Sequence, residues 1–163
     1  MTDRPVVVFD CMIYLQSLLN ETGLAVECFE LFERGDVTLI VSDEILEEIA
    51  DVLTRPKLQS KYSRLTRERA DKLLEILRET AKVLKSVPSH FKYSRDTKDE
   101  KYVNAAVESE ADYIVSRDND LLDLMTGHAD EAKEFRQRFR HLQIVEPVEF
   151  LRIIQEIDMA LIP

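Results

Sequence analysis

Short apolar runs that each stop at a polar or acidic residue are the feature that most constrains the fold of this chain. The first run, Val6 to Asp10, closes on a carboxylate, and Tyr113-Ile114-Val115 leads into Ser116-Arg117-Asp118. A run without polar alternation is typical of a strand buried on both faces, as in the parallel sheet of an α/β domain. Ligands bind at the carboxyl edge of such sheets, so Asp10 and Asp118 are candidate functional residues.

Strand and helix patterns alternate along the whole chain. Further strands are predicted at Val37–Val41, Val83–Val87 and Leu142–Val145, and the main helices at about Leu24–Arg34, from Asp43 to before Pro56, at about Thr66–Lys82, from Asp96 onward and from Pro147 through Ile154. No long linker, repeat or low-complexity segment interrupts this order. We therefore predict one α/β domain over residues 1–163, long enough to cover both faces of a sheet with helices.

The composition excludes several classes of protein. With 45% apolar and 33% charged residues the chain is typical of a globular domain. It has no apolar run near the roughly 18 residues that a membrane helix needs, and Met1–Pro5 lacks a signal-peptide pattern. Cys11 and Cys28 lie inside apolar patterns, which favours buried reduced thiols. These features together predict a cytoplasmic protein that does not enter a membrane.

Charge is unevenly distributed along the chain. A net charge of −10 argues against a general electrostatic grip on nucleic acid. One segment, which we call the basic segment, nevertheless carries seven cations against only Glu68 and Asp71; its cations are Arg55, Lys57, Lys61, Arg64, Arg67, Arg69 and Lys72. Such a segment is either a binding surface or an ordinary solvated face.

Two further acids lie where helical patterns meet the core. Glu48 falls at the edge of the apolar stripe in the helix after Asp43, so it is placed at the boundary between core and surface. Asp96 and Asp99 fit helix capping, which is the ordinary structural role for acids at this spacing. Asp99, however, precedes Tyr102, Val103 and Ala106 at spacings of three, four and seven, which places it on the buried face of its helix.

These acids, in this order, resemble the PIN domain family. The resemblance is carried by Asp10, by Glu48 in Ser42–Ile49, by Asp96-Thr97-Lys98-Asp99 and by Ser116-Arg117-Asp118, and it covers roughly residues 6–145. It implies a Rossmann-like, three-layer α/β/α fold around about five parallel strands, and a Mg²⁺- or Mn²⁺-dependent nuclease acting on single-stranded RNA. The family's metal-binding acids map onto Asp10, Glu48, Asp99 and Asp118, Asp120 is a candidate fifth acid, and Ser116 matches a hydroxyl residue beside the last acid.

The segment Val52–Leu58 also looks like the branch of toxin components of toxin–antitoxin systems, the VapC-like ribonucleases. That branch implies an antitoxin protein as partner and a homodimer. If the chain cleaves RNA, the basic segment would hold the RNA backbone, with Arg55, Lys57, Lys61 and Arg64 as the RNA-binding residues.

A divalent ion would compensate the negative charge of several acids that meet at one sheet edge. Clustered carboxylates repel one another and take up protons unless a counter-charge is present. Mg²⁺ or Mn²⁺ suits oxygen ligands, whereas zinc is disfavoured because His90, His128 and His141 lie outside the motifs. We expect Asp10 and Asp118 to bind the main ion, Asp99 to complete or bridge the site, and Glu48 to hold a ligand water or a second ion.

The chain departs from the family pattern after Asp10. Family members commonly have a polar pair such as Thr-Asn there, and this chain has Cys11-Met12. A catalytically weak or inactive PIN domain, acting as a binding module, is therefore an alternative. A phosphoryl-transfer protein of receiver or haloacid-dehalogenase type also places an Asp after its first strand, but the dehalogenase pattern needs a second Asp where Met12 stands. Acids that only cap helices are the remaining alternative.

Overall fold

The structure is a computed structural model that describes residues 4–161. Five parallel strands form one sheet in the order β3-β2-β1-β4-β5. Their bounds are β1 Val6–Phe9, β2 Thr38–Ser42, β3 Lys82–Leu84, β4 Tyr113–Val115 and β5 Gln143–Val145. The predicted α/β fold with about five parallel strands is confirmed.

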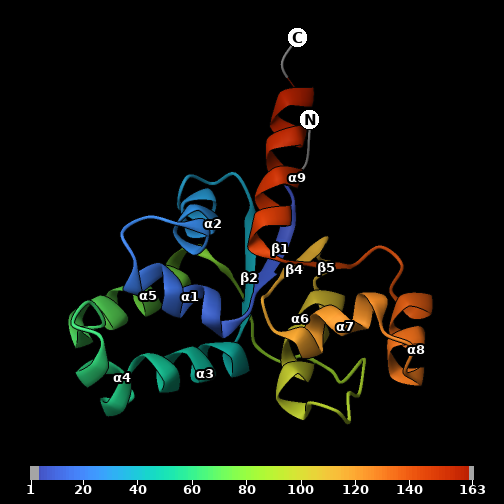
Figure 1. Cartoon of the computed structure of the whole chain (residues 1–163), viewed down its shortest axis with the longest axis horizontal. Coiled ribbons are helices and arrows are strands. Elements are labelled where there is room, and N and C mark those ends of the chain that lie inside the picture. The colour runs from blue at the N-terminus through green and yellow to red at the C-terminus, as the bar shows by residue number, and fades with distance from the viewer. Residues whose placement is uncertain (1–3, 162–163) are drawn as a thin grey trace.

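Helices cover both faces of the sheet and complete three layers (Figure 1). On one side lie α1 (Cys11–Leu19), α2 (Leu24–Glu33), α3 (Asp43–Leu53) and α5 (Arg67–Thr80), with the short α4 (Pro56–Lys61) beside α3. On the other side lie α6 (Glu100–Glu108), α7 (Asn119–Thr126) and α8 (Asp130–Arg138). The last helix, α9 (Pro147–Ala160), packs against α2 and β4.

Local sequence explains where these elements begin and end. In β1, Val7, Val8 and Phe9 are fully buried, as expected for a central strand covered on both faces. Ser42 is the N-cap of α3, because its Oγ accepts a hydrogen bond from the Ile45 amide at 3.1 Å. Gly35 follows α2 with a φ of 80°, a conformation that glycine adopts without steric cost.

The register of the central strands positions the carboxyl edge of the sheet. Phe9 pairs with Val115 across β1 and β4, and the Asp10 amide donates to the Val115 carbonyl at 3.1 Å. The next residues of the two strands, Asp10 and Ser116, are therefore neighbours although 106 positions separate them in the chain.

Several predicted boundaries differ from the structure. The third strand ends at Leu84 rather than Val87, because β3 is an edge strand that pairs only with β2. Asp96 caps a 3₁₀ turn, Thr97–Asp99, and α6 begins only at Glu100. The helix α4 was not predicted. Pro56 was interpreted only as the limit of α3, but it also occupies the first turn of α4.

The structure bears on the predictions about membrane helices, the signal peptide and the two cysteines. No helix within residues 4–161 is long and apolar enough to cross a membrane. The expectation about a signal peptide rests partly on Met1–Asp3, which lie outside the described residues. Cys11 and Cys28 are both buried free thiols, as predicted, and burial raises the pKa of each to about 12.

Candidate metal centre

Four carboxylates meet at the carboxyl edge of the sheet. Asp96, Asp99, Asp118 and Asp120, which we call the aspartate group, each offer an oxygen within 4.8 Å of the others. Asp96 and Asp99 bracket the 3₁₀ turn before α6. Asp118 is the N-cap of α7, and its Oδ1 accepts from the Asp120 amide at 2.8 Å. Two elements far apart in sequence thus supply two acids each.

Asp99 is the most constrained member of the group. It is only 7% exposed, and its buried Oδ2 has no hydrogen-bond partner among the described residues. Burial, together with the charges of Asp118 and Asp96, raises the pKa of Asp99 to about 8. A buried carboxylate oxygen without a donor is costly unless a proton or a cation compensates it. The group therefore fits a cation through an observation independent of the clustering itself.

Asp10 lies beside the aspartate group and is joined to it through Ser116. Its Oδ1 accepts from the amides of Met12 at 3.0 Å and Ile13 at 3.3 Å, which caps α1. The Ser116 hydroxyl donates to Asp10 Oδ2, and the same Ser116 Oγ accepts from the Asp118 amide at 2.9 Å. Burial raises the pKa of Asp10 to about 6, against the opposing effect of these hydrogen bonds. Ser116 thus sets the relative positions of two predicted metal-binding acids.

Glu48 is placed differently from the other predicted acids. It lies outside the aspartate group, and both of its carboxylate oxygens already have partners in the chain. The Tyr102 hydroxyl donates to Oε1, and Lys101 Nζ lies 3.0 Å from Oε2. The Tyr102 oxygen also accepts from the Cys11 amide at 3.1 Å, which connects Glu48 to the residue after Asp10.

Arg95 is a cation that contacts the aspartate group from its exposed side. Arg95 Nε lies 2.7 Å from Asp120 Oδ1, and Arg95 Nη1 lies 2.8 Å from Asp123 Oδ2. The Tyr93 hydroxyl donates to the Asp120 carbonyl at 2.7 Å. Burial and the nearby Asp96 still raise the pKa of Asp120, so Arg95 only partly offsets the local negative charge.

The structure therefore brings together Asp99, Asp118 and Asp120, places Asp10 next to them, and leaves Glu48 apart. Sequence reasoning missed Asp96 as a member of the group, because its spacing to Asp99 was interpreted as capping. Asp96 does both, since its Oδ1 also accepts from the Lys98 amide at 3.1 Å. The sequence did hold a signal for Asp96: two acids three residues apart, just before a helix whose buried face starts at Asp99.

The four predicted RNA-binding residues lie on or beside α4. Lys57 and Lys61 are exposed. Arg55 forms an ion pair with Asp51 at 2.8 Å, and Arg64 forms one with Glu21 at 3.0 Å. Exposed pairs of this kind are weak, so they do not prevent either arginine from exchanging its partner for a phosphate.

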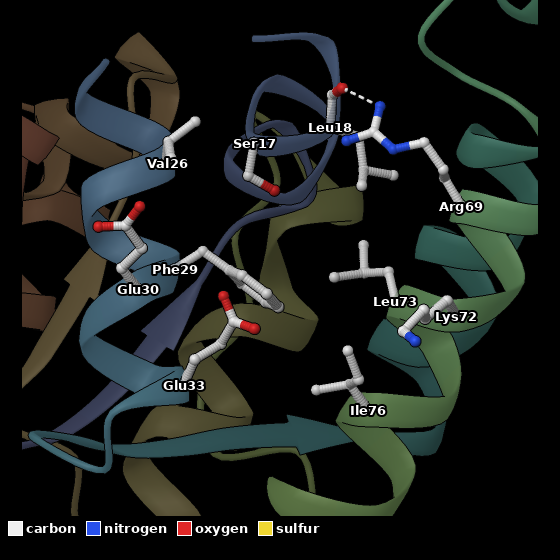
Figure 2. Close-up of a pocket in the computed structure, with 10 residues that line it drawn as sticks. All are labelled: Ser17, Leu18, Val26, Phe29, Glu30, Glu33, Arg69, Lys72, Leu73 and Ile76. Atoms are coloured by element: carbon white, nitrogen blue, oxygen red, sulfur yellow. Dashed lines mark hydrogen bonds between the residues drawn. The ribbon is translucent and has the colours of Figure 1, made fainter. Parts of the chain in front are cut away.

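The remaining candidate features lie away from the acids. His90 pairs with Glu108, His141 pairs with Asp112 and His128 is exposed. A hollow of about 250 Å³ between α1, α2 and α5 is lined by apolar side chains, with charged ones at its rim (Figure 2). It contains no member of the aspartate group, so it is not the candidate metal centre.

Comparison with known proteins identifies the family. The model of the PIN domain family matches residues 6–120, which is more than half of the chain and includes Asp10, Glu48 and the whole aspartate group. The chain belongs to the PIN domain family. PIN domains are generally metal-dependent nucleases, and they typically use a divalent ion. This assignment favours the predicted PIN fold over the phosphoryl-transfer alternatives.

Two further similarities extend over most of this PIN domain. The chain is 31% identical over 147 residues to the uncharacterized protein MJ1680 of Methanocaldococcus jannaschii, covering 89% of this chain and 88% of that protein. Its fold is also similar to the crystal structure of PAE2754 from Pyrobaculum aerophilum, with a TM-score of 0.47 and 18% identity over 84% of this chain and 96% of that one.

Proposed function

We propose that this PIN domain is a divalent-metal-dependent endoribonuclease that hydrolyses phosphodiester bonds of single-stranded RNA. The observation that carries the proposal is the aspartate group at the carboxyl edge of a parallel sheet, with a buried Asp99 Oδ2 that has no hydrogen-bond partner within residues 4–161. An all-oxygen donor set is what Mg²⁺ and Mn²⁺ prefer, and no described histidine or cysteine belongs to it.

The residues of the site divide into those that hold the cation and those that position them. Asp99 and Asp118 would be its principal ligands, with Asp96, Asp120 and Asp10 around them. When bound, Mg²⁺ or Mn²⁺ neutralises the charge of a phosphodiester and lowers the pKa of a water nucleophile. Ser116 holds Asp10 Oδ2 through its hydroxyl and the Asp118 amide through its lone pair, so both acids keep one geometry.

RNA is proposed as the substrate because the segment around α4 presents exposed cations on a chain that carries a net charge of −10. Arg55 is the N-cap of α4 and directly follows the end of α3, the helix that carries Glu48. Lys57 and Lys61 continue from it along α4, and Arg64 follows in the turn before α5. The backbone phosphates of an RNA strand lying along α4 would be compensated by these side chains.

We further propose that the protein is the toxin of a toxin–antitoxin pair, acts in the cytoplasm, forms a homodimer and is held inactive by an antitoxin protein. The support is the resemblance of Val52–Leu58 to that branch of the family. Gel filtration with light scattering tests the dimer. Growth arrest on expression, relieved by the product of an adjacent gene, tests the toxin role.

The test of the enzymatic proposal compares two variants with one control. Asp118→Asn and Asp10→Asn should abolish Mn²⁺-dependent cleavage of a single-stranded RNA, because each removes a charge that the cation requires. Asp130→Asn, which changes an exposed acid of α8, should leave cleavage unchanged. Circular dichroism and melting temperature are measured on all variants to confirm that each one folds. Cleavage retained by both site variants would refute the proposal.

The alternative, a PIN domain that binds but does not cleave, is favoured by one observation. Met12 is 46% exposed at the start of α1, in the position where the family commonly has a polar side chain. Met12 donates its amide to Asp10 but offers no side-chain group to orient a ligand. Calorimetry without any heat of Mg²⁺ or Mn²⁺ binding would support this alternative.

A further inference from the structure

Lys101 and Glu48 form an ion pair in which the lysine is nearly buried and the glutamate is partly exposed, and Lys101 follows Asp99 by two residues. The Lys101 side chain is 9% exposed, although a lysine normally extends into solvent. Its ammonium lies 3.0 Å from Glu48 Oε2, donates to the Lys98 carbonyl and lies 5.4 Å from the centre of the Tyr102 ring. The position of the ammonium is therefore set by three different contacts.

The position of the Glu48 carboxylate is also set by contacts with neighbouring residues. The Tyr102 hydroxyl donates to Oε1, and that hydroxyl oxygen is itself held by the Cys11 amide. Cys11 follows Asp10 directly, and the charges of both Glu48 and Lys101 act on its thiol. The ion pair thus lies on the same edge of the sheet as the acids, and α1, α3 and α6 together maintain it.

The partners of Glu48 leave it no free role as a metal ligand. A divalent ion at Glu48 would have to displace an ammonium that is already 3.0 Å away and shielded from solvent. Removing one member of such a pair would leave the other charge poorly compensated, which is unfavourable. Asp99, in contrast, presents an oxygen with no partner among the described residues.

We propose that Lys101 takes the place of a second divalent ion in this PIN domain, so that the centre binds one ion and Glu48 positions Lys101. The inference rests on the proposed function, because it describes how that centre is charged. It replaces the expectation that Glu48 holds a ligand water or a second ion. Lys101 would also supply a fixed positive charge, which could compensate a phosphate as a second ion otherwise would.

The count of Mn²⁺ ions bound per chain, measured by calorimetry and by electron paramagnetic resonance, tests the inference. We expect one ion for the natural protein, and one ion with an affinity changed less than threefold for Glu48→Gln. Lys101→Met should expose Glu48 and raise the count to two, and adding Glu48→Gln to Lys101→Met should return it to one. Lys98→Met is the matched control, because it removes an exposed lysine from the same turn and should keep the count at one.

The outcomes separate this inference from the proposed function. Two ions in the natural protein, with one lost in Glu48→Gln, would overturn the inference and leave a metal-dependent nuclease intact. A tenfold or greater loss of affinity in Glu48→Gln would also overturn it, because that is the size of effect expected when a group that supports the metal is removed. No Mn²⁺ binding by the natural protein would overturn the proposed function itself. If Lys101→Met fails to fold, Glu48→Gln still decides the question.

Discussion

At the scale of single residues, Asp99 shows how a functional site can reduce stability. Its side chain is buried next to three other carboxylates, and the pKa of Asp99 rises to about 8. In the unfolded chain the same group titrates near 3.8. The folded state therefore binds this proton more tightly, and the stability linked to it is complete below about pH 4 and is lost as the pH rises through about 8.

We predict that the metal-free protein has a lower melting temperature at pH 8.5 than at pH 6. Deprotonation of Asp99 then places a buried negative charge beside Asp118 and Asp96. Asp99→Asn should remove most of this pH dependence and raise the melting temperature at pH 8.5. Calorimetric scans in the presence of EDTA measure both effects, with Asp130→Asn as the control that keeps the natural pH profile. A flat profile in the natural protein would contradict the pKa assigned to Asp99.

At the level of helices, the side chain of Arg69 links α5 to the end of α1. Arg69 Nη1 donates to the Leu18 carbonyl at 2.7 Å (Figure 2). It also donates to the Arg64 carbonyl at 2.6 Å. These carbonyls lie at the end of α1 and in the turn before α5. Burial lowers the pKa of Arg69, which agrees with a guanidinium that is partly removed from water. Within the basic segment, Arg69 therefore has a structural role.

Arg69→Met should therefore destabilise the protein by about 1–3 kcal/mol, because two carbonyls lose their charged donor. For a chain of this size that corresponds to a fall of roughly 2–4 °C in melting temperature per kcal/mol. Arg67→Met is the matched control. Among the described residues, exposed Arg67 pairs only with Asp71 on the same helix, an interaction worth about 0.3–0.5 kcal/mol. Equal losses in the two variants would show that the contacts of Arg69 do not matter.

At the scale of the whole molecule, charge makes the proposed substrate depend on the cation. The chain carries a net charge of −10, and four acids meet at the site where RNA would be cleaved in our proposal. Affinity for nucleic acid comes mainly from cations at phosphates. The few exposed cations of α4 must therefore act together with a bound divalent ion.

We predict that a phosphorothioate single-stranded RNA binds at least tenfold more tightly with Mn²⁺ than with EDTA at 150 mM salt. Fluorescence anisotropy measures the dissociation constants. Lys57→Ala and Lys61→Ala should each weaken binding and lower the slope of affinity against salt concentration by about 1. Arg152→Ala on α9, where Arg152 pairs with Glu149 and Glu156, should change neither. Equal affinity with and without the metal would contradict a cation-dependent binding surface.

Much of the fold was predictable because it follows from local pattern. The unbroken apolar runs specify buried parallel strands, and Ser42 and Pro147 mark helix starts through caps and backbone geometry that act within one turn. The short helix α4 and the 3₁₀ turn at Thr97–Asp99 were not predicted, since both are only a turn or two long and have no apolar periodicity.

Hydrophobic periodicity and caps are local properties, so they specify the sheet, the helices that cover it and the acids at the ends of its strands. Which acids meet follows from the packing of distant elements. Asp96 joins Asp99, Asp118 and Asp120, while Glu48 is paired with Lys101 from another helix. Distances between side chains on different elements depend on strand register and helix packing, and no spacing along the chain encodes them.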